Sequence, residues 1–510
     1  MSNSSRIAKN TLMLYFRRIF ILLVSLYIVR IKLEILGIED YGIYNIVAGV
    51  VIMFSFLKEA MTISTQRFMI FYLGQNDTEQ VKNVYSASII IHVLTAFFFI
   101  LIAETIGLWF FKTWLNIPPE RQGIALFVYH FSVALTAINI FQVPYQATIM
   151  TYEKMSAFAF ISIIDILLKL GAVLLLTIIP FDKLLFYSFF VFLIGLIVMF
   201  IQKIYCNIVF KTVSFQFCKD KKLYHQLIKF SGWNLFGQVA NVSSSRGTNV
   251  LINIFYGVIL NSAMGIAMQV KSAVYSFVDN FQTAFRPQII KSYAAKDYNY
   301  FFRFVFQTSK ISFFLLFFFT LPLYINADFI LQLWLIDVPD YAVIFTQLIL
   351  LNSLVVSIAG PLTISIQATG NIKIFQLIES CLRFINLPLS FLFLYLGFSP
   401  VFVLFTRIAV DILSLIWRIV FLKKEIKLPI LGFLSKVFLP ILIITVTSTF
   451  ITVFFQSFFI GWIKLFLSCI ISSSSIILLI FIFGLDKQEK KSIKNWINKS
   501  FLYLKLKKQQ

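Results

Sequence analysis

The chain has 510 residues, of which 59% are hydrophobic and 13% are charged, whereas soluble globular domains carry roughly 45–50% apolar and about 25% charged residues. A soluble globular fold is therefore excluded. Because one bilayer span takes about 20 mostly apolar residues, the composition predicts an all-α polytopic membrane protein with little substance outside the bilayer.

Fourteen apolar runs, separated by charge, glycine or proline, are predicted to be transmembrane helices. The first six lie near 11–33, 42–66, 84–111, 122–148, 156–179 and 183–209. Six more lie near 230–255, 259–285, 304–334, 341–366, 373–396 and 399–422, and two near 432–455 and 458–484. The first run lacks a small-residue cleavage site, so we interpret it as an uncleaved span and not as a signal peptide.

The net charge of +22 is concentrated in loops that the positive-inside rule places in the cytoplasm. This orientation puts both termini in the cytoplasm and predicts a multi-pass membrane protein without a nucleic-acid partner. The predicted organisation is an N-lobe at 1–210, a basic cytoplasmic linker at 211–229, a C-lobe at 230–427, appended spans at 428–485 and a basic tail at 486–510.

The two blocks of six spans repeat each other at an offset near 220. Tyr72 aligns with Tyr293, Trp114 with Trp334, and the segment Asp165 to Lys169 with the segment Glu379 to Arg383. An even number of spans separates the copies, so both insert in the same orientation. Such parallel repeats are a transporter architecture, with the substrate route between the halves.

Charged side chains inside the membrane are costly, so they persist where they face a polar cavity or a partner. Five cations are our candidates for substrate binding, and Arg246, in a polar stretch of span seven, is the strongest; the set is Arg246, Arg17, Arg18, Lys271 and Lys58. The alternative for Arg17 and Arg18 is that they extend to the cytoplasmic interface. A surplus of cations favours an anionic substrate such as a phosphate or pyrophosphate.

Three acid–base pairs lie four residues apart, on one helix face each: Asp165 with Lys169, Glu379 with Arg383, and Arg407 with Asp411. One interpretation is that each pair neutralises itself and lets its helix insert. The other is that the pairs border the cavity and that an acid takes up a coupling H⁺ or Na⁺. The scattered Cys206, Cys218, Cys381 and Cys469 predict no disulfide framework, and with three distant histidines they predict no metal site. We expect no catalytic residues and no other cofactor.

The chain resembles the polysaccharide transporters of the multidrug/oligosaccharidyl-lipid/polysaccharide exporter (MOP) superfamily, the Wzx-like O-antigen flippases. The resemblance rests on the layout of six, six and two spans and on three motifs: the turn with Leu36, Gly37, Tyr41, Gly42 and Tyr44, the stretch 281–293, and the stretch 366–371. It implies a location in the bacterial inner membrane and a V-shaped pair of lobes with alternating access. It also implies a polyprenyl-pyrophosphate-linked oligosaccharide, a repeat unit for lipopolysaccharide or another polysaccharide, as the cargo flipped to the outer leaflet, with other polysaccharide-assembly proteins as possible partners.

Two other functions stay open. A MATE-like multidrug/cation antiporter shares the architecture, but its cavity is expected to hold an acid without a basic partner. A membrane polysaccharide polymerase or glycosyltransferase would be an enzyme on the same lipid-linked sugars, and it would need a larger external loop than the chain provides. We therefore predict a flippase without enzymatic chemistry.

Overall fold

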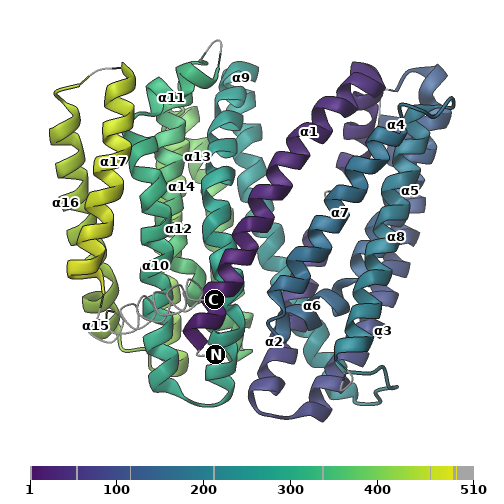
Figure 1. The fold of residues 1–510 in the computed structure, drawn as a ribbon, viewed down its shortest axis with the longest axis horizontal. Helices are drawn as coiled ribbons and strands as arrows, with labels where there is room; N and C mark the ends of the chain where they lie inside the picture. Colours follow the sequence, from purple (N-terminus) through teal and green to yellow (C-terminus); the bar gives the residue numbers. More distant parts are fainter. Residues whose placement is uncertain are drawn as a thin grey trace, which may run out of the picture. The chain divides into compact units, whose positions relative to one another are not determined.

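A computed structural model describes residues 3–52, 55–114, 117–210, 213–335, 338–459, 461–485 and 490, apart from some side chains in α1, α2 and α9. Throughout this described part the chain forms helices and connecting turns, without a strand (Figure 1). The predicted all-α class is therefore confirmed. Nearly all of the predicted basic tail, 486–510, lies outside the described residues.

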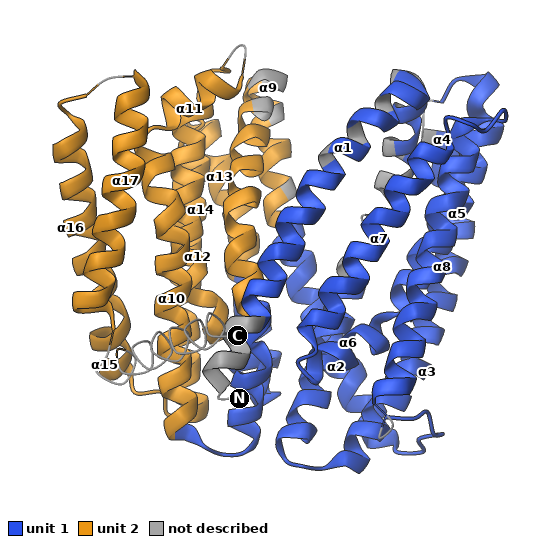
Figure 2. Ribbon diagram, viewed as in Figure 1, with its two compact units in different colours: residues 1–243, 283–298, 364–381 blue, residues 244–282, 299–363, 382–510 orange. Residues whose placement is uncertain are grey.

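The chain divides into two compact units (Figure 2). Unit 1 comprises Met1–Ser243, Thr283–Tyr298 and Ile364–Cys381, and unit 2 comprises Ser244–Gln282, Asn299–Thr363 and Leu382–Gln510. Unit 1 therefore contains the first sequence repeat and three segments of the second, at 221–243, 283–298 and 364–381. Each unit is described separately below.

The helices of the first sequence repeat all belong to unit 1. They are α1 (Asn3–Ile52), α2 (Ser55–Gly74), α3 (Thr78–Ile102), α4 (Leu108–Trp114), α5 (Gln122–Phe141), α6 (Val143–Thr151), α7 (Met155–Leu175) and α8 (Lys183–Val209), with a π-helical turn at Ala103–Gly107 and a 3₁₀ turn at Pro119–Arg121. Helix α1 is broken at Gly37, where φ is 75° and ψ is 173°. Glycine adopts this conformation without a Cβ clash, so Gly37 separates the first two predicted spans.

The second repeat begins with α9 (Lys221–Ala294), which joins the predicted spans 230–255 and 259–285 in one helical element. The following helices are α10 (Tyr298–Ile325), α11 (Ala327–Trp334), α12 (Ala342–Thr369), α13 (Lys373–Tyr395), α14 (Phe402–Ile426), α15 (Ile430–Phe433), α16 (Leu439–Gln456) and α17 (Gly461–Leu479), with π-helical turns at Leu434–Phe438 and Ile480–Gly484. An isolated Gly257 signals a turn, but a helix tolerates a single glycine at a cost of about 1 kcal/mol.

Nine helices in the described residues are long and apolar enough to cross a membrane. They coincide with predicted spans three to six, nine to eleven, thirteen and fourteen. The remaining predicted spans fall on α1, α2, α9 and α14, which carry several charged residues each. The chain is thus a multi-pass membrane protein, and its candidate site residues lie both on these more charged helices and on two of the nine, α7 and α13.

The two repeats use the same helix packing. In the first, α1 lies along α7: Asn10 donates to the Glu153 carbonyl and Arg17 to Ser162, at sequence separations of 143 and 145. In the second, the first part of α9 lies along α13, with Asn386 donating to Ser244 and Tyr256 to the Phe398 carbonyl, both at a separation of 142. Equivalent helices therefore meet in the same direction and at nearly the same register.

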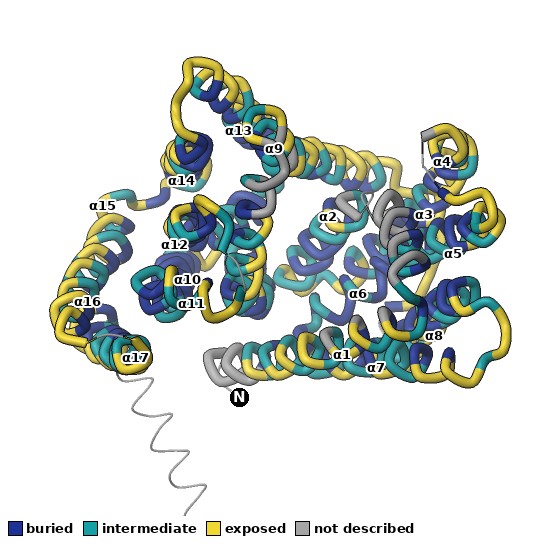
Figure 3. Tube along the Cα trace, turned by 90° about the horizontal axis from the view of Figure 1, so that it is seen from above, coloured by how far each residue is buried: buried dark blue, intermediate teal, exposed yellow. Residues whose placement is uncertain are grey.

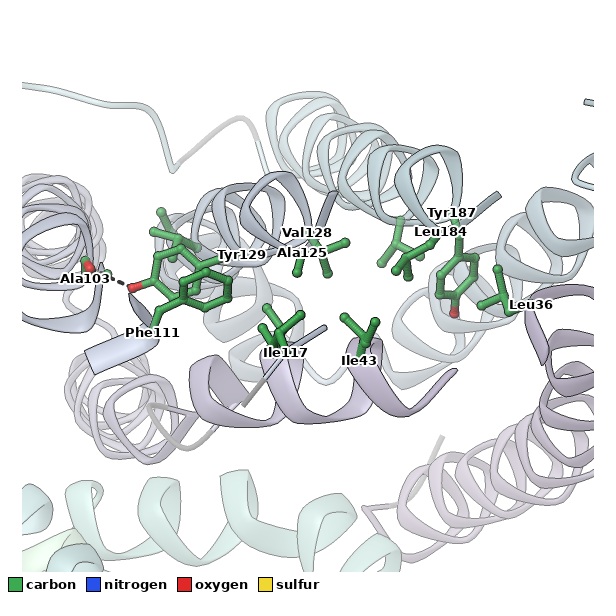
Figure 4. Packing of buried hydrophobic residues seen from close by; sticks show 14 of the residues in the cluster. Leu36, Ile43, Ala103, Phe111, Ile117, Ala125, Val128, Tyr129, Leu184 and Tyr187 are labelled. Atoms are coloured by element: carbon green, nitrogen blue, oxygen red, sulfur yellow. Dashed lines mark hydrogen bonds between the residues drawn. The ribbon is translucent and has the colours of Figure 1, made fainter. Parts of the chain in front are cut away.

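Unit 1 has an apolar core built from α1, α3, α4, α5, α7 and α8. It includes Ile43, Phe111, Val128 and Leu184, and the Tyr129 hydroxyl donates a 2.6 Å hydrogen bond to the Ala103 carbonyl in the π-helical turn (Figure 4). This bond ties α5 to the irregular segment that precedes α4.

The appended helix α16 separates its two faces clearly. Leu442, Val446 and Phe450, spaced four residues apart, are 62 to 69% exposed, whereas Ser448 and Thr452 are fully buried (Figure 3). The exposed stripe matches the lipid face of a transmembrane helix, where apolar side chains need no protein partner. The small polar residues instead face the neighbouring helix, as is common in membrane helix packing.

Candidate functional site

A charged cluster in unit 1 lies on α1, α2 and α7. On α7, Lys169 Nζ lies 2.8 Å from Asp165 Oδ2, and both side chains are about one-third exposed. Lys58 on α2 is within electrostatic range of Asp165 and Lys169. In the described part of the chain, Lys58 makes no ion pair with a carboxylate of its own. Although α2 and α7 are far apart in the sequence, Lys58 therefore lies near the Asp165 carboxylate, which is already paired with Lys169.

Two arginines on α1 extend this cluster. The guanidinium of Arg17 donates to Ser162 Oγ at 3.5 Å and lies 4.7 Å from the centre of the Phe158 ring, both on α7. Arg18 is half-buried next to it and acts on Arg17 electrostatically. In unit 1 the structure thus places five of the predicted residues on α1, α2 and α7, namely Arg17, Arg18, Lys58, Asp165 and Lys169, and four of the five are cations.

A second charged cluster lies in unit 2, on α9, α12, α13 and α14. Asn352 on α12 donates a 2.8 Å hydrogen bond to Asp411 Oδ2, and Arg383 Nη1 on α13 lies 3.9 Å from Asp411 Oδ1. We expected Asp411 to pair with Arg407 on its own helix. Arg407 acts on Asp411 electrostatically, but the cation nearest to the carboxylate is Arg383, because α13 packs against α14 at this level.

Two further cations of unit 2 surround Asp411 without an ion-pair contact in the described residues. Lys271 on α9 is within electrostatic range of Asp411, Asp279, Arg383 and Arg407, and its ammonium lies 5.9 Å from the centre of the Tyr275 ring. Like charges repel strongly in a medium of low dielectric constant. The three cations Lys271, Arg383 and Arg407 outnumber the two carboxylates that act on Lys271, those of Asp411 and Asp279, so the cluster forms a cationic environment in which one more anion would be stabilised.

Two predicted residues remain, Arg246 and Glu379. The side chain of Arg246 lies outside the described residues, so its role stays a prediction. Glu379 is buried in the part of α13 that belongs to unit 1, whereas Arg383 belongs to unit 2. Ser244 and Thr248 accept hydrogen bonds from Asn386, so part of the polar stretch around Arg246 holds α9 against α13.

Several charged residues with specific contacts were missed by the sequence analysis. Lys32 is 6% exposed, and its ammonium lies 4.6 Å from the ring centres of Tyr41 and Tyr44 and 5.2 Å from that of Tyr187. The predicted turn motif contains Tyr41 and Tyr44, but nothing in it identified Lys32 as their cationic partner. The attraction between an ammonium group and surrounding aromatic rings offsets part of the cost of burying the charge.

Arg121, at the start of α5, bridges two carboxylates of unit 1. Its Nε donates to Asp40 at 2.9 Å and its Nη1 to Asp182 at 2.5 Å. Asp182 also caps α8 by accepting from the Leu185 amide, as aspartate commonly does at a helix start. This network ties the end of α1 to α5 and α8, so we assign it a structural role.

No family model and no curated protein match the chain. Solved structures do match. An outward-facing multidrug resistance MATE family transporter of the MOP superfamily gives a TM-score of 0.72 at 12% identity, over 82% of this chain and 96% of that one. The MATE transporter ClbM in complex with Rb⁺ gives 0.69 at 14% identity, over 81% and 94%.

A third similar structure is a MOP superfamily transporter from Pyrococcus furiosus, described by a reverse polarity of its binding pocket that suggests a different function. It gives a TM-score of 0.67 at 12% identity, over 81% of this chain and 95% of that one. The chain therefore has the fold of MATE transporters of the MOP superfamily. At these identities the likeness extends to the fold and not to the substrate.

Proposed function

We propose that this chain is a secondary transporter with a MATE-type fold, which moves an amphipathic anion across the membrane by alternating access. The MATE fold supports the transporter part, and it favours the multidrug-exporter alternative over the polysaccharide flippase as a general class. A likeness in fold at 12 to 14% sequence identity does not identify the substrate. The proposal of an anionic substrate is therefore supported by the charge of the candidate site.

The observation that carries the substrate proposal is the charge balance around Asp411. Lys271, Arg383 and Arg407 act on one another and on this carboxylate, and an additional anion would relieve the repulsion between them. Arginine binds phosphate through two parallel hydrogen bonds. A lipid-linked pyrophosphate, such as the polyprenyl carrier of an oligosaccharide, combines this headgroup with a tail that stays in the bilayer.

A second candidate is export of an organic cation in exchange for H⁺ or Na⁺. The descriptions of the solved MATE structures favour it, and Asp165 and Asp411 would supply the acids. In both cases, however, a cation already contacts the carboxylate. A cationic drug would have to displace Lys169 or Arg383, which makes this candidate weaker on the geometry of the described residues.

The test is transport by the purified protein in liposomes. One arm measures how fast a fluorescent oligosaccharide on polyprenyl pyrophosphate becomes accessible to a membrane-impermeant reagent. The other arm measures accumulation of a cationic dye under an imposed H⁺ or Na⁺ gradient. We expect movement of the lipid, lost in the double variant Lys271→Ala/Arg407→Ala and kept in Lys464→Ala, a lysine on α17 outside both clusters. Movement of the dye alone would support the second candidate instead.

A further inference from the structure

Unit 1 joins residues from both sequence repeats. Its segments 221–243, 283–298 and 364–381 come from the second repeat, and the remaining residues come from the first repeat and the linker after it. The repeats approach closely, because a Cβ added to Gly74 at the end of α2 would lie 2.9 Å from the Ala294 Cβ at the end of α9. The question is which polar contacts hold these segments together.

The first contact is an ion pair at the turn between α6 and α7. Glu153 Oε1 lies 2.8 Å from Lys291 Nζ and accepts a 2.8 Å hydrogen bond from Gln288 Nε2, both on α9. The Glu153 side chain is 2% exposed and that of Lys291 is 24% exposed. A buried carboxylate requires such partners, because removing one leaves a charge without compensation.

The second contact is at the corresponding turn of the other repeat, between α12 and α13. Arg67 on α2 donates to the carbonyls of Gln367 and Ala368 at 3.2 and 3.0 Å, in the last turn of α12. Its guanidinium also lies 4.5 Å from the centre of the Phe68 ring and 4.6 Å from that of Phe71. A cation at a helix C-terminus satisfies open carbonyls and is favoured by the helix dipole.

These two contacts are equivalent in the repeat. Arg67 and Gln288 differ by 221 positions, the same offset that relates Tyr72 to Tyr293. The helices that precede the two turns, α6 and α12, end at Thr151 and Thr369. In each repeat, a residue at the same position of the alignment, Arg67 or Gln288, therefore contacts the equivalent turn of the other repeat. The contacts differ in kind, because Gln288 and Lys291 bind the Glu153 carboxylate, whereas Arg67 binds backbone carbonyls.

We propose that these reciprocal contacts, Glu153 with Lys291 and Gln288, and Arg67 with the 367–368 carbonyls, form a gate. The gate keeps the predicted cytoplasmic ends of the two repeats together in this conformation and has to open during each transport cycle. This inference rests on the proposed function, since only alternating access requires these ends to separate. In our orientation, the gate opens when the transporter receives its substrate from the cytoplasm.

The experiment measures gate opening without any substrate. Ala294→Cys, in a background with the four native cysteines replaced, places a thiol that is buried against Gly74 while the gate is closed. The readout is its labelling rate with a membrane-impermeant maleimide. We expect Glu153→Gln and Arg67→Lys each to raise this rate about tenfold, the shift that a loss of about 1.4 kcal/mol produces. The charge exchange Glu153→Lys/Lys291→Glu should return the rate to that of the parent protein.

The matched control is Glu104→Gln, which changes the 3.0 Å contact between the Glu104 carboxylate and His130 Nδ1. This pair lies wholly within the first repeat, so the labelling rate should not change. The proposal is overturned if Glu153→Gln and Arg67→Lys, both monodisperse, label no faster than Glu104→Gln, or if the charge exchange fails to restore protection. If the parent protein transports the anionic lipid but the gate variants label no faster, only the gate proposal is refuted. If the gate variants label faster but the parent protein moves no anion, only the proposed substrate is refuted.

Discussion

Asp411 on α14 accepts a 2.8 Å hydrogen bond from Asn352 on α12, and this bond holds a carboxylate that lies among three cations of unit 2. Both side chains are buried. A carboxylate held in this way limits the repulsion among Lys271, Arg383 and Arg407, and it also lowers the attraction of the cluster for an external anion. The two effects of Asp411 give separate predictions.

Replacing Asp411 by Asn should destabilise the folded protein, because three cations then lack their nearest carboxylate. We expect a loss of about 1–3 kcal/mol, seen as a lower midpoint of thermal unfolding in detergent. Asn352→Leu, which removes only the hydrogen bond, should cost less, about 1 kcal/mol. Equal stability of Asp411→Asn and the parent protein would argue against a cationic cluster around this residue.

The same substitution should strengthen the binding of inorganic pyrophosphate, because it removes a negative charge from the cluster. Lys271→Ala should weaken this binding, and Lys464→Ala should leave it unchanged. Calorimetric titration at low salt measures all three variants. Weaker pyrophosphate binding by Asp411→Asn would show that the anion does not bind at this cluster.

Gly370 provides a test of the Arg67 contact through a matched pair of glycines. Gly370 and Gly397 have similar positive φ angles of 80° and 83°, but a Cβ on Gly370 would lie 2.5 Å from Arg67 Nη2, whereas a Cβ on Gly397 would contact nothing within 4 Å. Alanine at either position costs roughly 1–2 kcal/mol of backbone strain. Gly370→Ala should therefore lower the thermal midpoint more than Gly397→Ala, and equal losses would contradict the position of Arg67.

The Arg121 network predicts a graded effect on stability. Arg121→Ala leaves both Asp40 and Asp182 without their shared cation, whereas Asp182→Asn keeps the contact with Asp40. Because the side chains of Arg121 and Asp182 are 29 and 27% exposed, solvent screening reduces the loss, which we place at about 2 kcal/mol for Arg121→Ala. Chemical unfolding in detergent should rank the arginine variant as the less stable, and the reverse order would refute the bridging role.

The fold could be predicted largely from the sequence because its signals are local. Long apolar runs give the helices, and the repeat offset near 220 anticipates the common packing of α1 on α7 and of α9 on α13. The ion pair of Asp165 and Lys169 was likewise visible at a spacing of one helical turn. Its role in substrate binding or coupling stays a prediction.

The ion pairs that sequence reasoning missed join residues far apart in the sequence. Arg383 contacts Asp411 from another helix, and Lys291 contacts Glu153 across 138 positions. The pattern of charges four residues apart cannot report such pairs, because helix packing decides which faces meet. Arg67 also left no signal in the sequence, since its acceptors are backbone carbonyls that any residue provides.

The most direct test of the central claim compares the affinity of the purified protein for three amphiphiles: a polyprenyl pyrophosphate, the corresponding uncharged polyprenol, and a lipophilic organic cation. We predict that the polyprenyl pyrophosphate binds at least about tenfold more tightly than the polyprenol and the cation, and that rising salt weakens its binding. Preferred binding of the cation, or equal affinities for the pyrophosphate and the polyprenol, would contradict it.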